Sequence, residues 1–454
     1  MYSLDDTIAA IGTPPGQGGI GIVRLSGPEA LAILQQVFQP AQDRDWVARR
    51  ITFGQVVDPD TGEVVDEALA FYIPAPHTYT RQDVAEIQGH GSPISLQRIL
   101  NLVLRHGARQ AEPGEFTLRA FVNGRLDLAQ AEAVLDLIQA RTEAGHRIAM
   151  AQLSGRLSDA VRRVRQQLLD ILAYLEASID FTDEEVPPQD IAQPLEGVLN
   201  ELGRLLQDAE RGIIYRQGVR AAIVGQPNVG KSSLLNALLR VERAIVTEVP
   251  GTTRDTLEET INLRGVPLVL VDTAGIADTE DQVERLGVIR SRQALEQADV
   301  ALLVVDASQP LHTEDREIAA LIGNRPAILV VNKIDLKPPV MAFHALLAGA
   351  PCVHVSALTG AGLEALEEAL VDTVLTGRAI AGHRPMVSNP RHKALLTQAA
   401  THVQSALEAY ARGVPADFVS IDVTAAVNAL GEITGETASE DLLDAIFSQF
   451  CVGK

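Results

Sequence analysis

The fold is decided by one stretch of the sequence, Val219-Arg220-Ala221-Ala222-Ile223-Val224-Gly225-Gln226-Pro227-Asn228-Val229-Gly230-Lys231-Ser232-Ser233-Leu234-Leu235. Residues 221–224 form an apolar run typical of a buried strand, and leucines at helical spacing follow from Leu234 onward. The segment between them matches the G-x-x-x-x-G-K-S phosphate loop in the strand, loop and helix context that this motif requires. Its backbone N–H groups and the following helix N-terminus can surround phosphate oxygens. We therefore expect a P-loop nucleotide-binding domain.

Two side chains of this loop have separate predicted tasks. Lys231 would reach the β- and γ-phosphates, and the Ser232 hydroxyl would ligate a Mg²⁺ ion that bridges them. The residues expected to contact GTP from this loop are Asn228, Val229, Gly230, Lys231, Ser232 and Ser233.

Outward from the loop, three further strings follow predicted strands. Asp272-Thr273-Ala274-Gly275 would hold Mg²⁺ through water at Asp272 and meet the γ-phosphate at Gly275. In Asn332-Lys333-Ile334-Asp335, the Asp335 carboxylate can accept from guanine N1–H and the 2-amino group, whereas adenine offers no matching donors. A mismatch of buried polar groups costs roughly 10⁴-fold or more in discrimination. Ser356-Ala357-Leu358 would contact the base edge, and the strings together predict GTP binding.

A switch segment is expected between the phosphate loop and Asp272. Thr253 would close on Mg²⁺ when the γ-phosphate is present. Many small GTPases carry a water-orienting glutamine after the Asp-x-x-Gly string, but Ile276 occupies that position here. The predicted GTP contacts of the switch are Thr247, Glu248, Val249, Pro250, Gly251, Thr252 and Thr253.

The chain as a whole predicts four segments. Residues 1–118 read as an α+β N-terminal domain, and residues 119–216 as the first part of a helical domain. Residues 217–376 alternate strand and helix, with strands at 221–224, 266–271, 300–305, 327–331 and 352–355. Residues 377–454 return to helix. The expected fold class is α/β plus α, in which a Ras-like GTPase domain with a doubly wound sheet is inserted into the helical domain.

Composition limits the possible functions. The 454 residues carry a formal net charge of −21, which argues against broad electrostatic capture of nucleic acid, so any RNA partner must meet local basic spots or a second protein. The two cysteines, Cys352 and Cys451, fit a reducing compartment. The N-terminus is acidic where a signal peptide is basic, and no apolar run has membrane-spanning length. We expect a cytoplasmic protein.

Several other features favour structural interpretations. The glycine-rich residues 16–21 match a dinucleotide fingerprint as a string, but they precede a strand and are interpreted as a turn. His90 lies between glycines without sequence-adjacent carboxylates or cysteines and is interpreted as structural. The acids of residues 181–188 are interpreted as a solvated turn. Arg162, Arg163 and Arg165 form either a solvated helix face or a local RNA contact.

The assembled motifs resemble the tRNA-modifying GTPase family MnmE, also called TrmE, over nearly the whole chain. The strings that carry the resemblance, besides the GTPase motifs, are Thr13-Pro14-Pro15-Gly16, Gly21-Ile22-Val23-Arg24-Leu25-Ser26-Gly27, Glu86-Ile87-Gln88-Gly89-His90-Gly91, Pro113-Gly114-Glu115-Phe116, Leu126-Asp127-Leu128-Ala129-Gln130-Ala131-Glu132-Ala133 and the terminal Cys451-Val452-Gly453-Lys454.

The resemblance implies an N-terminal domain that binds a tetrahydrofolate derivative (5-formyl- or methylene-tetrahydrofolate) and forms a homodimer. It also implies a flavoprotein partner, MnmG, which carries FAD. Together they install an aminomethyl or carboxymethylaminomethyl group at C5 of the tRNA wobble uridine. Arg24, Glu86, Arg125 and Lys454 match the folate-binding positions, and Arg125 stands where some relatives have lysine. Cys451 is a candidate nucleophile, with a structural role equally open.

For hydrolysis, the resemblance implies a K⁺ ion in place of an arginine finger. The ion would be held by Asn228, Thr247, Val249 and Thr252. Such a finger is worth about 10³–10⁵ in rate. Glu284 matches the family's water-orienting glutamate, and Asn228 and Lys231 complete the predicted catalytic set.

Two other function classes remain open from the sequence. A ribosome-assembly GTPase typically adds a second GTPase domain or a basic RNA-binding module, whereas this acidic chain has one phosphate loop. A folate-dependent one-carbon transferase acting on a small molecule, with a regulatory GTPase, is separated from a tRNA-modifying enzyme by co-purification with tRNA and a flavoprotein.

Overall fold

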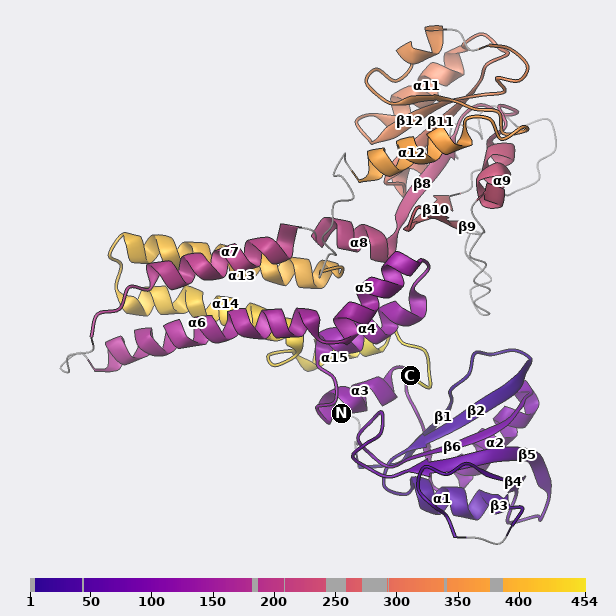
Figure 1. Ribbon diagram of the computed structural model, residues 1–454, viewed down its shortest axis with the longest axis vertical. Coiled ribbons are helices and arrows are strands. Elements are labelled where there is room, and N and C mark those ends of the chain that lie inside the picture. The colour runs from indigo at the N-terminus through magenta and orange to yellow at the C-terminus, as the bar shows by residue number, and fades with distance from the viewer. Residues whose placement is uncertain are drawn as a thin grey trace. The chain divides into compact units, whose positions relative to one another are not determined.

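The computed structural model describes residues 5–42, 45–181, 187–207, 209–241, 259–271, 292, 294–338, 341–375 and 387–454. The chain divides into two compact units (Figure 1). The first unit comprises Met1–Leu135, Gln152–Ile191 and Ser405–Lys454, and the second comprises Asp136–Ala151 and Ala192–Gln404.

The first unit contains a seven-stranded sheet with the order β3-β4-β5-β6-β2-β1-β7. The strands pair antiparallel except for β1 and β7, which are parallel. The strands are β1 (Ile8–Ile11), β2 (Gly18–Ser26), β3 (Phe38–Pro40), β4 (Thr52–Val57), β5 (Val64–Ile73), β6 (Val84–Gly91) and β7 (Arg109–Gln110). Alternating apolar residues such as Val23, Leu25 and Ile87 point to one face, where they meet apolar residues of two helices.

Helices of the first unit cover this sheet or form a separate antiparallel layer. Helices α1 and α2 bury Ile33 and Ile99 against the sheet. Helix α6 packs along α14, and α15 closes a smaller core with Leu128 and Phe447. The helices are α1 (Ala30–Val37), α2 (Pro93–Arg105), α3 (Glu115–Val122), α4 (Leu128–Gln139, which extends into the second unit), α6 (Arg156–Asp180), α14 (Ala416–Thr434) and α15 (Glu440–Phe447).

The second unit contains a six-stranded sheet with the order β13-β12-β11-β8-β10-β9. All neighbouring strands are parallel except β9 and β10. The strands are β8 (Val219–Val224), β9 (Glu259–Leu263), β10 (Val266–Val271), β11 (Val300–Asp306), β12 (Ala327–Asn332) and β13 (Cys352–His354). The central strands are apolar on both sides, as expected where helices cover both faces.

Two hydrophobic cores fill the two faces of this sheet. Helices α9 and α12 pack on one face, and helix α11 and the 3-10 helix η1 pack on the other. The remaining elements of this unit are α5 (Glu143–Leu153, whose last residues fall in the first unit), α7 (Ala192–Gln207), α8 (Ala209–Gln217), α9 (Lys231–Val241), α11 (Thr313–Ile322), η1 (Met341–Ala345), α12 (Leu363–Val374) and α13 (Pro390–Ala411, which ends in the first unit).

The five strands predicted for the second unit agree with the structure to within two residues at each end, whereas the edge strand β9 was not predicted. The glycine-rich residues 16–21 run into strand β2 and do not open a helix, so this string lacks the strand-to-helix context of the dinucleotide fingerprint. In the part of the chain that the structure describes, no helix is both long and apolar enough to cross a bilayer.

Candidate nucleotide-binding site and N-terminal cluster

The phosphate loop lies at the switch point of the doubly wound sheet. Strand β8 is flanked by β10 and β11, and the loop leaves its carboxyl end before helix α9 begins at Lys231. Ligands bind at this point in open α/β sheets. Gly230 has a φ of +97°, and a Cβ there would lie 2.3 Å from the Asn332 Nδ2 atom. A side chain at this position would therefore displace the loop from the neighbouring recognition string.

Asn332 connects the phosphate loop to the base-edge loop. Its Nδ2 donates to the Val229 carbonyl over 2.9 Å, and its Oδ1 accepts from the Ala357 backbone N–H over 3.0 Å. The side chain is only 1% exposed. Because both ends of the amide are used, the loops that follow β8, β12 and β13 are held together at one edge of the sheet.

Two lysines donate hydrogen bonds to oxygens at the same edge of the sheet. Lys231 Nζ donates to the carbonyls of Gly225 and Gln226 at 2.9 and 2.7 Å. Lys333 Nζ donates to the Asn228 carbonyl at 2.7 Å and pairs with Asp306 at 2.6 Å. Burial would raise the pKa of Asp306, but hydrogen bonds from Lys333 and Ser308 outweigh it and lower the pKa below 3.8. Asp306 thus stays ionised and fixes Lys333.

Asp335 is held by the serine of the last string. Ser356 Oγ donates to Asp335 Oδ1 over 2.6 Å, and the Thr359 N–H donates to Ser356 Oγ. The Asp335 side chain remains exposed, and Leu358 is 85% exposed. The carboxylate is therefore oriented on one side while it stays open to a base on the other.

Other predicted site residues lie outside the described part of the chain. They are Thr247, Glu248, Val249, Pro250, Gly251, Thr252, Thr253, Asp272, Thr273, Ala274, Gly275 and Glu284. Of the predicted K⁺ ligands, only Asn228 is described; its φ is +63°. Ser232 and Ser233 are exposed in the first turn of α9.

A cavity of about 290 Å³ adjoins the phosphate loop and contains residues that the sequence analysis did not identify. Its lining includes Asp306, His312, Asp315 and Phe343 beside Asn228 and Lys333. The sequence could have indicated Asp306 as a site residue, because it ends strand β11 at the sheet edge where ligands bind. No sequence pattern indicated Phe343, because it comes from a short helix far along the chain.

In the first unit, Arg24 and Glu86 face each other on neighbouring strands. They are register partners on β2 and β6, and Arg24 Nε donates to Glu86 Oε1 over 2.6 Å. The Arg24 guanidinium also lies over the Phe116 ring, 5.9 Å from its centroid. The structure thus brings together two of the predicted folate-binding residues, although 62 positions separate them in sequence.

Arg125 stacks on Tyr79, which also borders the Arg24 pair. The Arg125 guanidinium carbon lies 4.7 Å from the Tyr79 ring centroid, and the Tyr79 hydroxyl shares a hydrogen bond with Thr117 over 3.0 Å. Burial raises the pKa of Tyr79, while the charges of Arg125 and Arg24 act to lower it. Both arginines therefore belong to one neighbourhood, which we call the N-terminal cluster: Arg24, Glu86, Tyr79, Phe116, Thr117 and Arg125.

The C-terminal tail lies beside this cluster. Val452 forms a β-bridge with Pro113. Gly453, with a φ of +93°, lies so close to β1 that a Cβ would be 2.5 Å from the Ile11 carbonyl oxygen and 3.3 Å from the Gly12 Cα. A Cβ on Gly12 would in turn be 4.0 Å from the Arg24 guanidinium carbon. The tail backbone is thus anchored at Val452 and Gly453, between Cys451, which is exposed, and Lys454.

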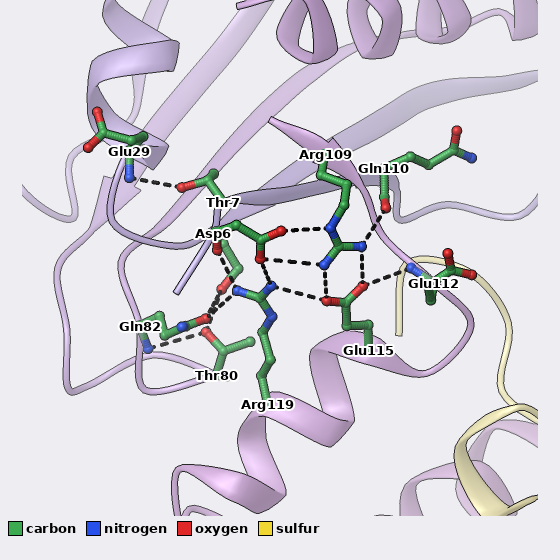
Figure 2. Close-up of polar contacts among 11 residues, drawn as sticks. Asp6, Thr7, Glu29, Thr80, Gln82, Arg109, Gln110, Glu112, Glu115 and Arg119 are labelled. Atoms are coloured by element: carbon green, nitrogen blue, oxygen red, sulfur yellow. Dashed lines mark hydrogen bonds and ion pairs between the residues drawn. The ribbon is translucent and has the colours of Figure 1, made fainter. Parts of the chain in front are cut away.

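A partly buried ion network holds helix α3, which contributes Phe116 and Thr117, against the sheet (Figure 2). Arg119 donates to Glu115 at 3.0 Å and also pairs with Asp6. Arg109 on β7 bridges the same two carboxylates, both at 2.6 Å. Burial acts to raise the pKa of Asp6 and of Glu115, but hydrogen bonds from the arginines outweigh it and lower both pKa values. The sequence analysis did not predict this network.

Comparison with known proteins identifies the family. Residues 7–125 match the model of the GTP-binding protein TrmE N-terminus, and residues 128–451 match the MnmE helical domain. The chain belongs to the tRNA modification GTPase MnmE family. It is 54% identical to the tRNA modification GTPase MnmE of Roseiflexus sp. (strain RS-1), with 99% of each chain covered. It is 52% identical to that of Chloroflexus aurantiacus, over 99% of this chain and 100% of the relative.

Membership in the MnmE family confirms the predicted fold class. The match to the helical domain starts before the six-stranded sheet and ends after it, so the GTPase fold is inserted into a helical domain. The chain is a GTPase, and enzymes of this kind bind their nucleotide with Mg²⁺.

One structural interpretation within this MnmE-family chain needs correction. His90 was interpreted as a histidine without a carboxylate neighbour, but its Nδ1 lies 2.7 Å from Asp66 Oδ1 on strand β5. The hydrogen bond that His90 donates to Asp66 raises the pKa of His90. Ser95 donates to the other Asp66 oxygen over 2.8 Å. Strand pairing brings Asp66 near, which the sequence spacing of 24 residues did not reveal.

Proposed function

We propose that this GTPase modifies the wobble uridine of tRNAs by adding an aminomethyl or carboxymethylaminomethyl group at C5. In this proposal a tetrahydrofolate derivative donates the one-carbon unit, and the flavoprotein MnmG supplies FAD. One observation supports this proposal: a chain of the MnmE family contains two separate sites. One is the sheet edge at Asn332 and Ala357 that is predicted to bind the guanine nucleotide, and the other is the N-terminal cluster with its Arg24–Glu86 ion pair.

The proposal includes an organisation of the chain. Residues 1–118 form the folate-binding and dimerising domain, residues 119–216 and 377–454 the helical domain, and residues 217–376 the GTPase domain. The protein acts as a homodimer in the cytoplasm, where its two free cysteines stay reduced.

The N-terminal cluster suits a folate derivative by its donor set. The buried Glu86 carboxylate can accept from the paired N–H groups of a pterin edge, and its ion pair with Arg24 orients it. Tyr79 and Arg125 offer a stacked flat surface, and Lys454 adds a positive charge suited to a carboxylate tail. Cys451 is kept as a candidate for the modification chemistry. When bound, the folate would supply the carbon that is transferred.

Replacing Arg24 with Met is expected to weaken binding of 5-formyl-tetrahydrofolate by about tenfold to a hundredfold. The reason is that a hydrogen bond to a charged group contributes about 1.5–3 kcal/mol. Titration calorimetry on the full chain measures the affinity. Arg98→Met, which removes an exposed arginine paired with Glu63 on the same sheet domain, serves as the matched control. Equal affinities for Arg24→Met and Arg98→Met would remove Arg24 from the folate site.

For hydrolysis, we propose that a K⁺ ion is held by Asn228, Thr247, Val249 and Thr252, and that Glu284 orients the attacking water. Ser232, Thr253 and Asp272 would hold Mg²⁺, with Asp272 acting through water. The backbone of Asn228 is left-handed and its side chain is exposed. This supports Asn228 as a K⁺ ligand, because its carboxamide points away from the interior of the phosphate loop.

The tRNA proposal is tested in cells whose protein is replaced by Lys231→Ala. Loss of the lysine removes the charge that meets the β- and γ-phosphates, so GTP hydrolysis should fall sharply. We expect the modified wobble uridines to disappear from bulk tRNA, as measured by nucleoside mass spectrometry. Lys337→Ala, a change at an exposed lysine of the same domain, should leave them at the wild-type level. Persistence of these nucleosides in cells with a hydrolysis-deficient Lys231→Ala protein would contradict the proposal.

A further inference from the structure

Three side chains with metal-binding atoms meet at the edge of the GTPase sheet, away from the phosphate loop. Cys352 and His354 lie two positions apart on β13, so they point to the same face of this strand. His344 comes from the 3-10 helix η1 on that same face. Strand β13 is the terminal strand of the sheet, so the group is reachable from solvent.

The ligand atoms of the three residues are already close together. One ligand atom of each lies within 4.8 Å of the other two. Cys352 Sγ is 4.0 Å from His354 Nε2, and the two imidazole rings are 6.0 Å apart between centroids, edge to face. In a tetrahedral zinc site, bonds of about 2.0–2.3 Å separate neighbouring ligand atoms by roughly 3.4–3.6 Å. Small rotations of the exposed His344 side chain and of the half-buried Cys352 and His354 side chains can supply the difference.

We propose that His344, Cys352 and His354 bind a divalent transition-metal ion of the zinc class. Thiolate with imidazole is the donor set that zinc prefers, and three protein ligands leave a fourth position for water. This His344/Cys352/His354 site is distinct from the Mg²⁺ and K⁺ positions of the nucleotide, which are built from oxygen ligands. It does not depend on the proposed tRNA chemistry.

Burial shifts the pKa values of His354 and Cys352, and the two shifts act in opposite senses on metal binding. Burial lowers the pKa of His354, and the nearby His344 lowers it further, so its ring is neutral and available as a ligand at neutral pH. Burial raises the pKa of the Cys352 thiol. Binding of the ion therefore replaces the thiol proton by a metal–sulfur bond and releases that proton to solvent.

An ion in this position would clamp η1 to β13, and both elements lead to the nucleotide edge. Phe343, next to His344, lines the cavity beside Asn228 and Lys333. Residues Ser356 and Ala357 follow β13 directly and contact Asp335 and Asn332. The metal would thus restrain the two segments that border the guanine side of the site.

Titration of the reduced full-length protein with Co²⁺, a spectroscopic substitute for zinc, tests the proposal. The protein is first saturated with GDP and Mg²⁺, so that the oxygen-ligand site is occupied. We expect a sulfur-to-cobalt charge-transfer band that saturates at one ion per chain and disappears when Zn²⁺ is added. Cys352→Ser should abolish the band, and His344→Ala should weaken Co²⁺ binding by more than about 100-fold.

The second cysteine supplies the matched control. Cys451→Ser should keep the full charge-transfer band, because Cys451 lies at the C-terminus in the other compact unit. Zn²⁺ should also slow amide hydrogen exchange of residues 343–346 in the wild-type protein and leave it unchanged in Cys352→Ser. Absence of a thiolate band in the wild-type protein, or an equal band in Cys352→Ser, would overturn the proposal.

Discussion

Replacing Asp335 with Asn is expected to lower the preference for guanine over xanthine nucleotides by roughly 10⁴-fold. The reason is that the Asp335 carboxylate would accept from both the N1–H and the 2-amino group of guanine. An asparagine amide instead presents one acceptor and one donor, which match the N1–H and the 2-oxo group of xanthine. Competition of GDP and xanthosine diphosphate against a fluorescent nucleotide measures the change in preference.

The Asp335→Asn substitution should change base recognition without disturbing the surrounding fold. Asp335 is exposed and takes its hydrogen bond from Ser356 Oγ, which can donate equally to an amide oxygen. Thermal stability should therefore remain close to that of the wild-type protein. Asp372→Asn, which removes an exposed carboxylate from α12 in the same domain, should keep the guanine preference. A guanine preference that survives in Asp335→Asn would show that Asp335 does not read the base.

Replacing Arg119 with Met is expected to destabilise the first unit by about 3–5 kcal/mol. The side chain is fully buried and pairs with Asp6 and Glu115, so its loss leaves carboxylate charge buried with Arg109 as its remaining charged partner (Figure 2). Urea-dependent hydrogen exchange of β1, β7 and α3 measures the free energy of unfolding of this unit. Arg98→Met breaks an exposed pair and should cost less than about 1 kcal/mol.

The same network predicts how this stability depends on pH. The pKa values of Asp6 and Glu115 are lowered in the folded protein from 3.8 and 4.5. Their contribution is therefore complete above about pH 4.5 and is lost as the pH falls through the lower, folded pKa values. The loss of stability on acidification should be smaller in Arg119→Met, because much of the pairing is already absent. The double variant Arg119→Met with Glu115→Leu should regain part of the stability at neutral pH; a further loss would argue against charge burial as the cause.

Local pattern was sufficient to predict five strands of the GTPase sheet but not the antiparallel edge strand β9. Apolar runs such as residues 300–305 are bounded by turn residues, and the glycines of the phosphate loop follow directly after a strand. Such signals lie within a few residues of one another, so backbone preference and burial act on the same short segment. The resemblance strings then indicated the family and, with it, the insertion of the GTPase fold into a helical domain.

Contacts between distant segments were decided only by the tertiary structure. The pairing of His90 with Asp66, the network of Arg119 with Asp6, and the meeting of His344 with Cys352 all join different elements. Strand register sets the first of these contacts, and the docking of α3 and of η1 sets the others. The sequence by itself was sufficient to predict which residues bind phosphate and guanine, because those residues follow one another in short strings. The partners of the buried charges and the metal-binding side chains came from the sheet order and from helix packing, which bring together residues with no regular spacing in the sequence.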